Sequence, residues 1–180
     1  MNIPNLLTSL RIVASFFFLY FGLHNDWNLA LPVFCAAAAT DMIDGALARL
    51  LKQRTSLGGF LDPMADKLLL FFSFVTLTLH HYIPVELTIL VILRDLMIIS
   101  GLFYLQWQRV SVAYKPTYLS KANTLFQVLT VFVALVESNN LFPFLVKGMP
   151  YLVWITSFLT VTTGVHYFVI GWRILNHEAV

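Results

Sequence analysis

Long apolar stretches alternate with short polar breaks along the whole chain. The breaks include HNDWN, HHYIP and the Asn- and Pro-containing ESNNLFPF, and few charges interrupt the stretches between them. A helix that crosses a bilayer needs about 20 mainly apolar residues, which is close to the length of each stretch. The pattern therefore predicts a bundle of six transmembrane helices with short connections, at residues 7–23, 29–51, 61–80, 84–107, 119–136 and 149–175.

The composition supports an all-α integral membrane protein that forms one domain over residues 1–180. Hydrophobic residues make up 59% of the chain and charged residues 11%, whereas soluble domains carry about 25% charged residues. No basic run is interleaved with aromatic residues, which argues against a nucleic-acid partner. The one cysteine, Cys35, lies in an apolar run, and we expect no removable signal peptide.

The positive charges predict how the bundle is oriented. If the N-terminus is cytoplasmic, nine of the 11 Lys and Arg residues fall at or near the cytoplasmic side, whereas Lys147 falls outside and Arg94 falls within the fourth span. This asymmetry follows the positive-inside rule, so we expect both termini in the cytoplasm. The nine residues are Arg11, Arg49, Lys52, Arg54, Lys67, Arg109, Lys115, Lys121 and Arg173.

Four of the nine acidic residues gather where the second predicted helix ends and the third begins. Asp41 and Asp44 are three residues apart on the second helix, and Asp62 and Asp66 are four residues apart on the third. Each pair therefore shares one helix face, and the short turn between the helices allows the two faces to meet. We expect the four carboxylates to converge just inside the membrane at its cytoplasmic side.

Such a cluster must either bind protons or hold cations. A charged side chain at the bilayer centre costs about 2.5–3.5 kcal/mol on insertion scales, and mutual repulsion adds to that cost. All the ligands are oxygens, with no His or Cys among them, which favours Mg²⁺ or Mn²⁺ over zinc. Two such cations would form a two-metal centre suited to displacement at phosphorus. The alternatives are solvated helix ends and an ion or proton transporter, which also carries carboxylates within the membrane.

The residues around the aspartates fit a phosphate-bearing ligand. Gly45 and Ala48 are small and leave room for a bulky group near the helix backbone. Arg49, one turn further on, has a fork of donors that can hold a phosphate. Gly58 and Gly59 are expected in the turn before the third helix.

Read in order, the stretch from Asp41 to Asp66 is D-x2-D-G-x2-A-R-x8-G-x3-D-x3-D, with eight fixed positions over 26 residues. It resembles the defining motif of the CDP-alcohol phosphotransferases, and the likeness covers essentially the whole chain. The resemblance implies an enzyme of phospholipid synthesis with six transmembrane helices. In its reaction, an acceptor hydroxyl attacks the phosphatidyl phosphorus of CDP-diacylglycerol and CMP leaves. A homodimer in a bacterial or mitochondrial inner membrane is also implied, with its active site at the cytoplasmic side or the mitochondrial equivalent.

By position, the resemblance assigns a role to each residue of the motif. Four residues would hold two divalent cations, Mg²⁺ or Mn²⁺: Asp41, Asp44, Asp62 and Asp66. Asp66 would also be the catalytic base that takes the proton of the acceptor. The cytidine diphosphate group would be bound by Asp41, Gly45, Ala48, Arg49 and Gly58.

The resemblance also implies the acceptor, because NIPNLLTSLRI and FLDPMADK resemble the family branch that makes anionic glycerophospholipids. We expect phosphatidylglycerol or glycerol 3-phosphate. Members that use glycerol 3-phosphate usually carry cations at the positions that match Leu102 and Asn123 in this chain. Two of the cations expected for a phosphate dianion are therefore absent here. This absence favours phosphatidylglycerol as the acceptor and cardiolipin as the product.

Polar residues in and beside the fourth and fifth spans are candidates for binding the acceptor. Arg94 lies deep in the fourth span, where an ionisable residue indicates a functional site or a tie between helices. Because Arg94 and Asp95 are adjacent, and so about 100° apart around the helix, we expect them not to pair and Arg94 to face the cavity. Lys115, Ser120 and Lys121 mark the cytoplasmic entrance of the fifth span, as acceptor ligands or as positive-inside anchors.

Overall fold

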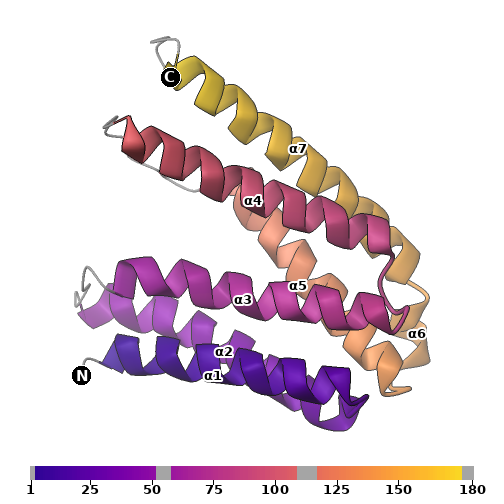
Figure 1. Cartoon of the computed structure of the whole chain (residues 1–180). Helices are drawn as coiled ribbons and strands as arrows, with labels where there is room; N and C mark the ends of the chain where they lie inside the picture. The colour runs from indigo at the N-terminus through magenta and orange to yellow at the C-terminus, as the bar shows by residue number, and fades with distance from the viewer. Residues whose placement is uncertain (1–2, 52–57, 109–116, 176–180) are drawn as a thin grey trace. The chain divides into compact units, whose positions relative to one another are not determined.

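The part of the chain that the computed structural model describes consists of α-helices joined by short turns. The backbone is described for residues 3–51, 58–108 and 117–175, and side chains are described within these ranges except at residues 3–8, 41–51, 58–66, 102, 106 and 175. These ranges contain no strand. The helices, labelled in Figure 1, are α1 (Ile3–Leu23), α2 (Trp27–Leu51), α3 (Gly58–Leu79), α4 (Val85–Trp107), α5 (Tyr118–Ser138), α6 (Pro143–Val146) and α7 (Met149–Leu175).

The six long helices lie where the apolar pattern predicts them. Their ends differ from the predicted ends by at most four residues, and α7 begins and ends as predicted. The predicted position of Gly58 and Gly59 is wrong, because they begin α3 instead of preceding it. Glycine is tolerated at a helix N-terminus, where the first N–H groups have no helical partner in any case. The four-residue α6 is too short for an apolar pattern to reveal.

The lengths and composition of the helices suit a bilayer. Among the described residues, three helical stretches are long and apolar enough to cross a membrane, namely Val85–Leu105, Tyr118–Ser138 and Met149–Ile174. Three further apolar stretches are shorter, namely Ser9–Leu23, Trp27–Thr40 and Lys67–Leu79. The all-helical, apolar architecture is therefore confirmed, whereas the crossing of the membrane by all six long helices stays a prediction.

The chain divides into two compact units. Unit 1 comprises Met1–Tyr82 and Val131–Val146, and unit 2 comprises Ile83–Thr130 and Lys147–Val180. Helix α5 belongs to both, since its first part lies in unit 2 and its last part in unit 1. The expectation of one membrane domain over residues 1–180 stays a prediction.

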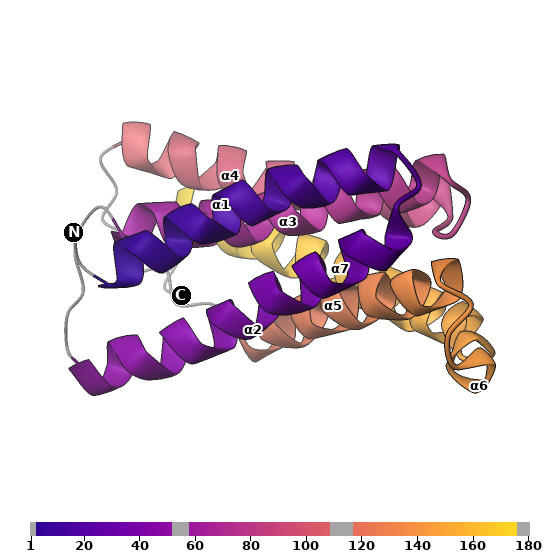
Figure 2. The same ribbon diagram turned by 90° about the horizontal axis from the view of Figure 1, so that it is seen from below.

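Unit 1 is built around α1, which packs against both α2 and α3. Helices α1 and α3 run side by side in Figures 1 and 2. Between α1 and α2, the ring centroids of the buried Phe18 and Phe34 lie 6.0 Å apart. Gly22 permits a close approach of α1 to α3, because a Cβ atom at this position would lie only 3.1 Å from the Cβ of Thr76. A small residue at this point therefore brings two helix backbones together.

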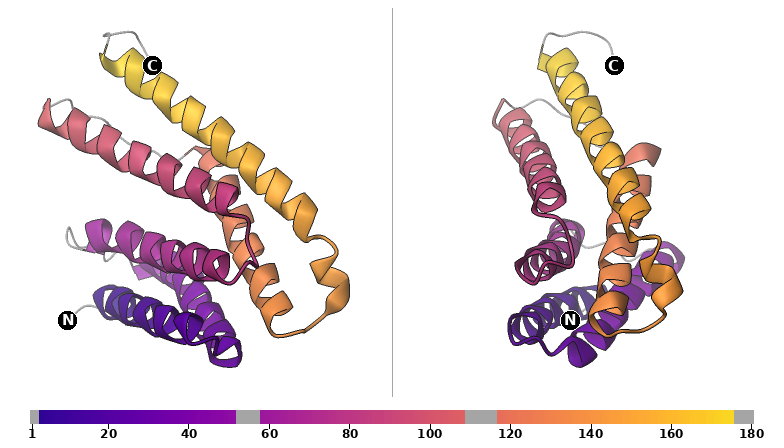
Figure 3. Two further views of the ribbon diagram at one scale, coloured as in Figure 1. Left: turned by 45° about the vertical axis from the view of Figure 1, so that its right-hand side comes forward. Right: turned by 90° about the vertical axis from the view of Figure 1, so that its right-hand side faces the viewer.

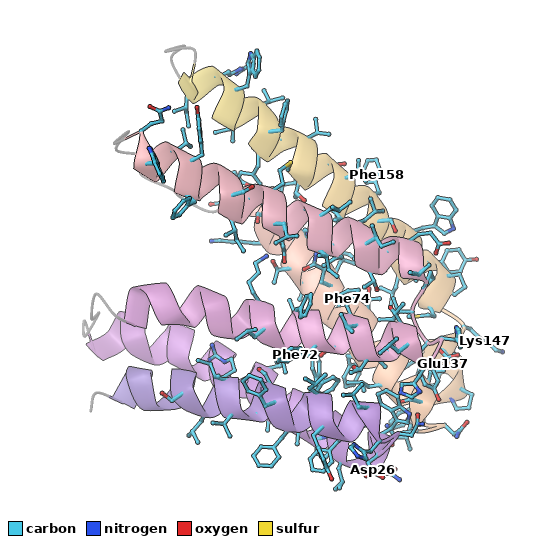
Figure 4. All side chains as sticks on the ribbon, viewed as in Figure 1. Asp26, Phe72, Phe74, Glu137, Lys147 and Phe158 are labelled. Carbon is cyan, nitrogen blue, oxygen red and sulfur yellow. The ribbon has the colours of Figure 1, made fainter. Side chains whose placement is uncertain are left out.

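Side chains at one end of unit 1 connect its helices. The Nδ2 atom of Asn139, in the turn after α5, donates to the backbone oxygen of Trp27 at 3.1 Å. The ring of His80, at the end of α3, meets the Trp27 ring edge-on with their centroids 5.2 Å apart. Figure 4 labels Asp26 and Glu137 at this same end. Helix α2 ends, and α3 begins, at the opposite end of the unit (Figures 1 and 2).

In unit 2, α4 packs against α7, and Figure 3 shows the two helices side by side from two directions. Hydrogen bonds connect α5 to α7. The hydroxyl oxygens of Thr130 and Thr156 lie 2.9 Å apart, and Thr160 donates to the side-chain oxygen of Asn123 at 3.0 Å. Away from these contacts, α7 carries large exposed apolar side chains such as Phe158, labelled in Figure 4. Unit 2 therefore combines buried polar contacts with an apolar surface.

Candidate functional site

The aspartate motif spans the end of α2 and the beginning of α3. Asp41 and Asp44 lie in α2, and Asp62 and Asp66 lie in α3, so both pairs are in continuous helix as predicted. Their spacings place each pair on one helix face. The end of α2 and the beginning of α3 lie at the same end of unit 1 (Figures 1 and 2). The four side chains lie outside the described residues, so the convergence of the carboxylates stays a prediction.

The residues assigned to the cytidine diphosphate group occupy the same two helix ends. Gly45, Ala48 and Arg49 lie on the last turns of α2, and Gly58 is the first residue of α3. Their side chains also lie outside the described residues. Their binding roles therefore stay predictions, although their backbones lie on the two helices that carry the aspartates.

The donor set of the motif fits a hard divalent cation. The four aspartates offer only carboxylate oxygens, the ligand type that Mg²⁺ and Mn²⁺ prefer. Continuous helix through both pairs preserves the spacing that a shared site requires. Among the side chains that are described, no three or more His, Cys, Asp or Glu residues lie together, and the four aspartates are not part of that set.

Arg94 is a buried cation in unit 2, with a side chain only 4% exposed. Its Nη1 atom donates to Oδ1 of Asp95 at 2.7 Å, and its Nη2 atom donates to Oγ of Ser120 at 2.8 Å. The guanidinium also lies over the ring of Tyr167, 5.8 Å from the centroid. Its Nε atom is buried and has no hydrogen-bond partner among the described residues. At least one nitrogen donor of this cation therefore has no partner among the side chains and backbone that the structure describes.

The ion pair of Arg94 with Asp95 shows that the expectation of no pairing between them is wrong. Their Cα atoms are about 100° apart around the helix, but the long arginine side chain reaches back to the carboxylate. Leaving the guanidinium buried without a counter-charge would cost far more than bending the side chain. The direction in which the side chain of Arg94 leaves the helix therefore did not determine where its guanidinium group lies.

The other three candidate acceptor ligands have different positions. Ser120 accepts the hydrogen bond from Arg94, so the structure brings these two candidates together. Lys121 is exposed, with its Nζ atom 5.7 Å from the ring centroid of Tyr118. Lys115 lies outside the described residues. The acceptor-binding role of all four residues stays a prediction.

A buried polar seam between α5 and α7 was missed in the sequence. We call it the α5–α7 polar seam; its members are at most 1% exposed and are Asn123, Gln127 and Thr130 on α5 and Thr156, Thr160 and Thr163 on α7. On each helix the members are spaced i, i+4, i+7, which is the period of one helix face and is the signal that would have revealed them. Both polar side-chain atoms of Gln127 are buried and have no hydrogen-bond partner among the described residues.

Comparison with protein families gives one match. Residues 1–166 match the sequence model of the family described as CDP-alcohol phosphatidyltransferase.

The chain is similar to curated proteins that carry one of two enzyme names. It is 37% identical over 150 residues to the human "Cardiolipin synthase (CMP-forming)", covering 74% of this chain and 50% of that protein. It is 32% identical over 151 residues to the "Probable cardiolipin synthase (CMP-forming)" of Drosophila melanogaster, covering 75% of this chain and 47% of that protein. It is 50% identical over 84 residues to the "CDP-diacylglycerol--glycerol-3-phosphate 3-phosphatidyltransferase" of Pseudomonas fluorescens, covering 45% of this chain and 43% of that protein. The chain spans about half the length of the curated relatives that it matches.

Proposed function

Because the chain belongs to the CDP-alcohol phosphatidyltransferase family, we propose that it transfers a phosphatidyl group from CDP-diacylglycerol to phosphatidylglycerol, forming cardiolipin and CMP. The observation that carries the proposal is the eight-position aspartate motif on the end of α2 and the beginning of α3. An ion or proton transporter would need carboxylates but not the Gly, Ala and Arg positions that lie between them. The motif therefore supports chemistry at a phosphate group.

The reaction requires one base and one set of phosphate ligands. The hydroxyl oxygen of the acceptor forms a bond to the phosphatidyl phosphorus, the bond from that phosphorus to CMP breaks, and Asp66 accepts the hydroxyl proton. Arg49 holds a phosphate oxygen through its fork of N–H donors. Gly45 and Ala48 leave room for the nucleotide beside the backbone of α2. Gly58 contributes to the same site from the beginning of α3.

Two divalent cations, Mg²⁺ or Mn²⁺, would be held by Asp41, Asp44, Asp62 and Asp66. When bound, they would offset the negative charge of the pyrophosphate and of the leaving CMP. The nearby positive charge also favours the ionised form of Asp66, which is the form that accepts a proton. The four carboxylates would therefore serve as metal ligands, and Asp66 would also serve as the base.

The choice of acceptor rests on charge. Glycerol 3-phosphate is a small, well-hydrated ion, and a site that captures it must replace its lost hydration with several cations. Position 123 holds a neutral, fully buried asparagine whose oxygen accepts a hydrogen bond from Thr160. The remaining cations, with Arg94, Lys115 and Lys121 among them, suit the single charge of a phosphodiester, and Ser120 supports Arg94. This balance favours phosphatidylglycerol.

The proposed enzyme is a multi-pass membrane protein with six transmembrane helices and both termini in the cytoplasm. This topology is supported by the six long apolar helices and by the excess of Lys and Arg on one side. It places the aspartate motif at the cytoplasmic side of an inner membrane, where a nucleotide has access. A homodimer is part of the same proposal.

Product analysis tests the proposed function. Purified protein in vesicles is given CDP-diacylglycerol with either phosphatidylglycerol or glycerol 3-phosphate, and the lipid product is identified by mass spectrometry. We expect cardiolipin and CMP at a rate well above that of phosphatidylglycerophosphate formation. Excess EDTA should stop CMP release, and Mg²⁺ or Mn²⁺ should restore it. Full activity in EDTA would contradict the metal assignment, and an absence of CMP would contradict the enzyme assignment.

Phosphatidylglycerophosphate synthesis is the second candidate function. It is favoured by the higher identity, over a shorter stretch, to the protein from Pseudomonas fluorescens. Dominant phosphatidylglycerophosphate in the same product analysis would select it and leave the aspartate chemistry unchanged.

A further inference from the structure

A groove lies between α4 and α7 among the described residues of unit 2. Its volume is about 290 Å³. Its apolar wall is made of Leu90, Leu93 and Met97 from α4 and Val161, Val165 and Phe168 from α7. Leu93, Val165 and Phe168 are 58%, 58% and 60% exposed, so the groove is open along the outer surface of the helix pair.

The groove also has a charged and polar floor. Arg94 and Thr160 line it together with the apolar residues. Arg94 is nearly fully buried, and its Nε atom is the donor without a partner among the described residues. Thr160 belongs to the α5–α7 polar seam through its hydrogen bond to Asn123. A ligand of this groove should therefore be apolar over most of its length and should carry an anionic or hydrogen-bond-accepting group.

Gly164 keeps the groove open on the α7 side. A Cβ atom at this position would lie 3.6 Å from Cε of Met97 and 3.8 Å from Cγ of Arg94, which is ordinary van der Waals contact. An alanine is therefore tolerated sterically, whereas a larger side chain would project into the groove. By contrast, a Cβ atom at Gly171 on the same helix would meet nothing within 4 Å.

We propose that this groove binds one acyl chain of the acceptor lipid, phosphatidylglycerol, with the lipid phosphodiester directed to Arg94. The inference rests on the proposed function, since it names where the acceptor is held. The volume of about 290 Å³ lies just below the range of about 300–1,000 Å³ for small-molecule sites, which suits one acyl chain and not a whole lipid. A wall of Leu, Met, Val and Phe offers a chain the same kind of contacts as bilayer lipid. The buried cation distinguishes the groove from a surface that any lipid would cover.

Photolabelling tests the location without relying on turnover. The probe is phosphatidylglycerol with a diazirine in one acyl chain, and the control probe is phosphatidylcholine with the same chain. We expect the phosphatidylglycerol probe to label peptides that contain residues 90–97 and 160–168, and unlabelled phosphatidylglycerol to compete. Labelling of other peptides would overturn the inference. Equal labelling by the phosphatidylcholine probe would also overturn it, because the groove would then be in contact with any surrounding lipid and would not select phosphatidylglycerol.

Kinetics of paired variants test the same groove from both helices. Gly164→Leu fills it from α7, and Gly171→Leu is the control on the same helix. Leu93→Trp narrows it from α4, and the control is Leu96→Trp, because Leu93 and Leu96 are 58% and 57% exposed but only Leu93 lines the groove. We expect the two groove variants to raise the KM for phosphatidylglycerol about tenfold, equivalent to about 1.4 kcal/mol of binding free energy. Their KM for CDP-diacylglycerol should stay within about twofold of the unmodified protein, about 0.4 kcal/mol.

The outcomes separate this inference from the proposed function. Cardiolipin formation with an unchanged phosphatidylglycerol KM in both groove variants, and no label in the groove, would remove the inference and leave the function. Specific label in the groove without cardiolipin formation would remove the function and leave a phosphatidylglycerol site. Leu93→Trp changes an exposed side chain, so it keeps the test decisive even if Gly164→Leu fails to fold.

Discussion

Asp66 is the residue on which the proposed chemistry depends most, since we propose it as both a metal ligand and the base. Its position in continuous helix, four residues after Asp62, keeps the two residues on one face of α3. An asparagine at position 66 retains the size of the side chain but loses the negative charge and the ability to accept a proton. The Asp66→Asn substitution therefore tests the catalytic step separately from the binding of the nucleotide.

We expect Asp66→Asn to abolish CMP release while binding of CDP-diacylglycerol remains measurable. General bases typically contribute about 10²–10⁴-fold, and the weakened metal site adds to that loss. The measurement is CMP release alongside equilibrium binding of labelled CDP-diacylglycerol. Asp26→Asn, which neutralises an exposed aspartate before α2, is the matched control and should retain activity. An Asp66→Asn protein with ordinary kinetics would remove Asp66 from the mechanism.

The burial of Asn123 changes the expected effect of a substitution at this position. Its lack of charge is one reason to favour phosphatidylglycerol, and Asn123→Lys would restore the charge that a glycerol 3-phosphate site requires. However, Asn123 is fully buried and accepts a hydrogen bond from Thr160. A lysine here would bury an ammonium group and leave the threonine hydroxyl without its acceptor.

We therefore expect Asn123→Lys to lower the free energy of unfolding by about 2–3 kcal/mol without switching the product to phosphatidylglycerophosphate. The readouts are unfolding of the purified protein in mixed detergents and mass spectrometry of the product. Thr124→Lys adds the same charge at the next, exposed position and should unfold like the unmodified protein. A stable Asn123→Lys protein that makes mainly phosphatidylglycerophosphate would show that position 123 determines the acceptor.

At the scale of helices, the α5–α7 polar seam is the contact that the apolar pattern did not reveal. Threonine hydroxyls in a bilayer can bond to their own helix, as Thr130 does to the backbone oxygen of Phe126 at 2.8 Å. The same hydroxyl lies 2.9 Å from that of Thr156 on α7. Interhelical hydrogen bonds of this kind contribute modestly, because the separated helices also find polar partners within the membrane.

A double-mutant cycle measures this helix pairing. We expect Thr130→Val and Thr156→Val, alone and combined, to give a coupling free energy of about 0.6 kcal/mol, the average for such bonds in membranes. Unfolding in mixed detergents supplies the free energies. Thr162→Val is the control, since its hydroxyl bonds to the backbone oxygen of Phe158 on its own helix. A coupling of zero would mean that the two hydroxyls do not stabilise the pairing of α5 with α7.

At the scale of the whole molecule, the proposed topology makes the two ends of α5 chemically distinct. The turn after α5 contains Asn140, and the segment that follows α4 begins at Gln108. With both termini in the cytoplasm, Asn140 faces the outside and Gln108 faces the cytoplasm. Both side chains are exposed, so each position suits chemical labelling.

Cysteine labelling tests this orientation in right-side-out vesicles. In a Cys35→Ala background, which removes the one native cysteine, a membrane-impermeant maleimide should label Asn140→Cys directly. Gln108→Cys should react only after the vesicles are permeabilised. The reverse pattern would place the aspartate motif on the outer side, where it would have no access to a cytoplasmic nucleotide.

The sequence by itself determined the helices and the candidate chemistry. Apolar length is set by bilayer thickness, so the six long helices lie within a few residues of their predicted positions. Family membership followed from the motif between Asp41 and Asp66, because closely spaced motif positions on two consecutive helices can be read along the chain. Short-range helical spacing alone placed each aspartate pair on one face.

Only the tertiary structure decided which side chains meet. The pairing of Arg94 with Asp95 depends on a long side chain that bends, and its contact with Ser120 joins residues 26 positions apart. The α5–α7 polar seam and the α4–α7 groove likewise combine residues from separate helices. The periodicity of apolar residues indicates which face of a helix is apolar, but it does not indicate which other helix packs against that face. Packing decides that, since it depends on shape and on partners distant in the sequence.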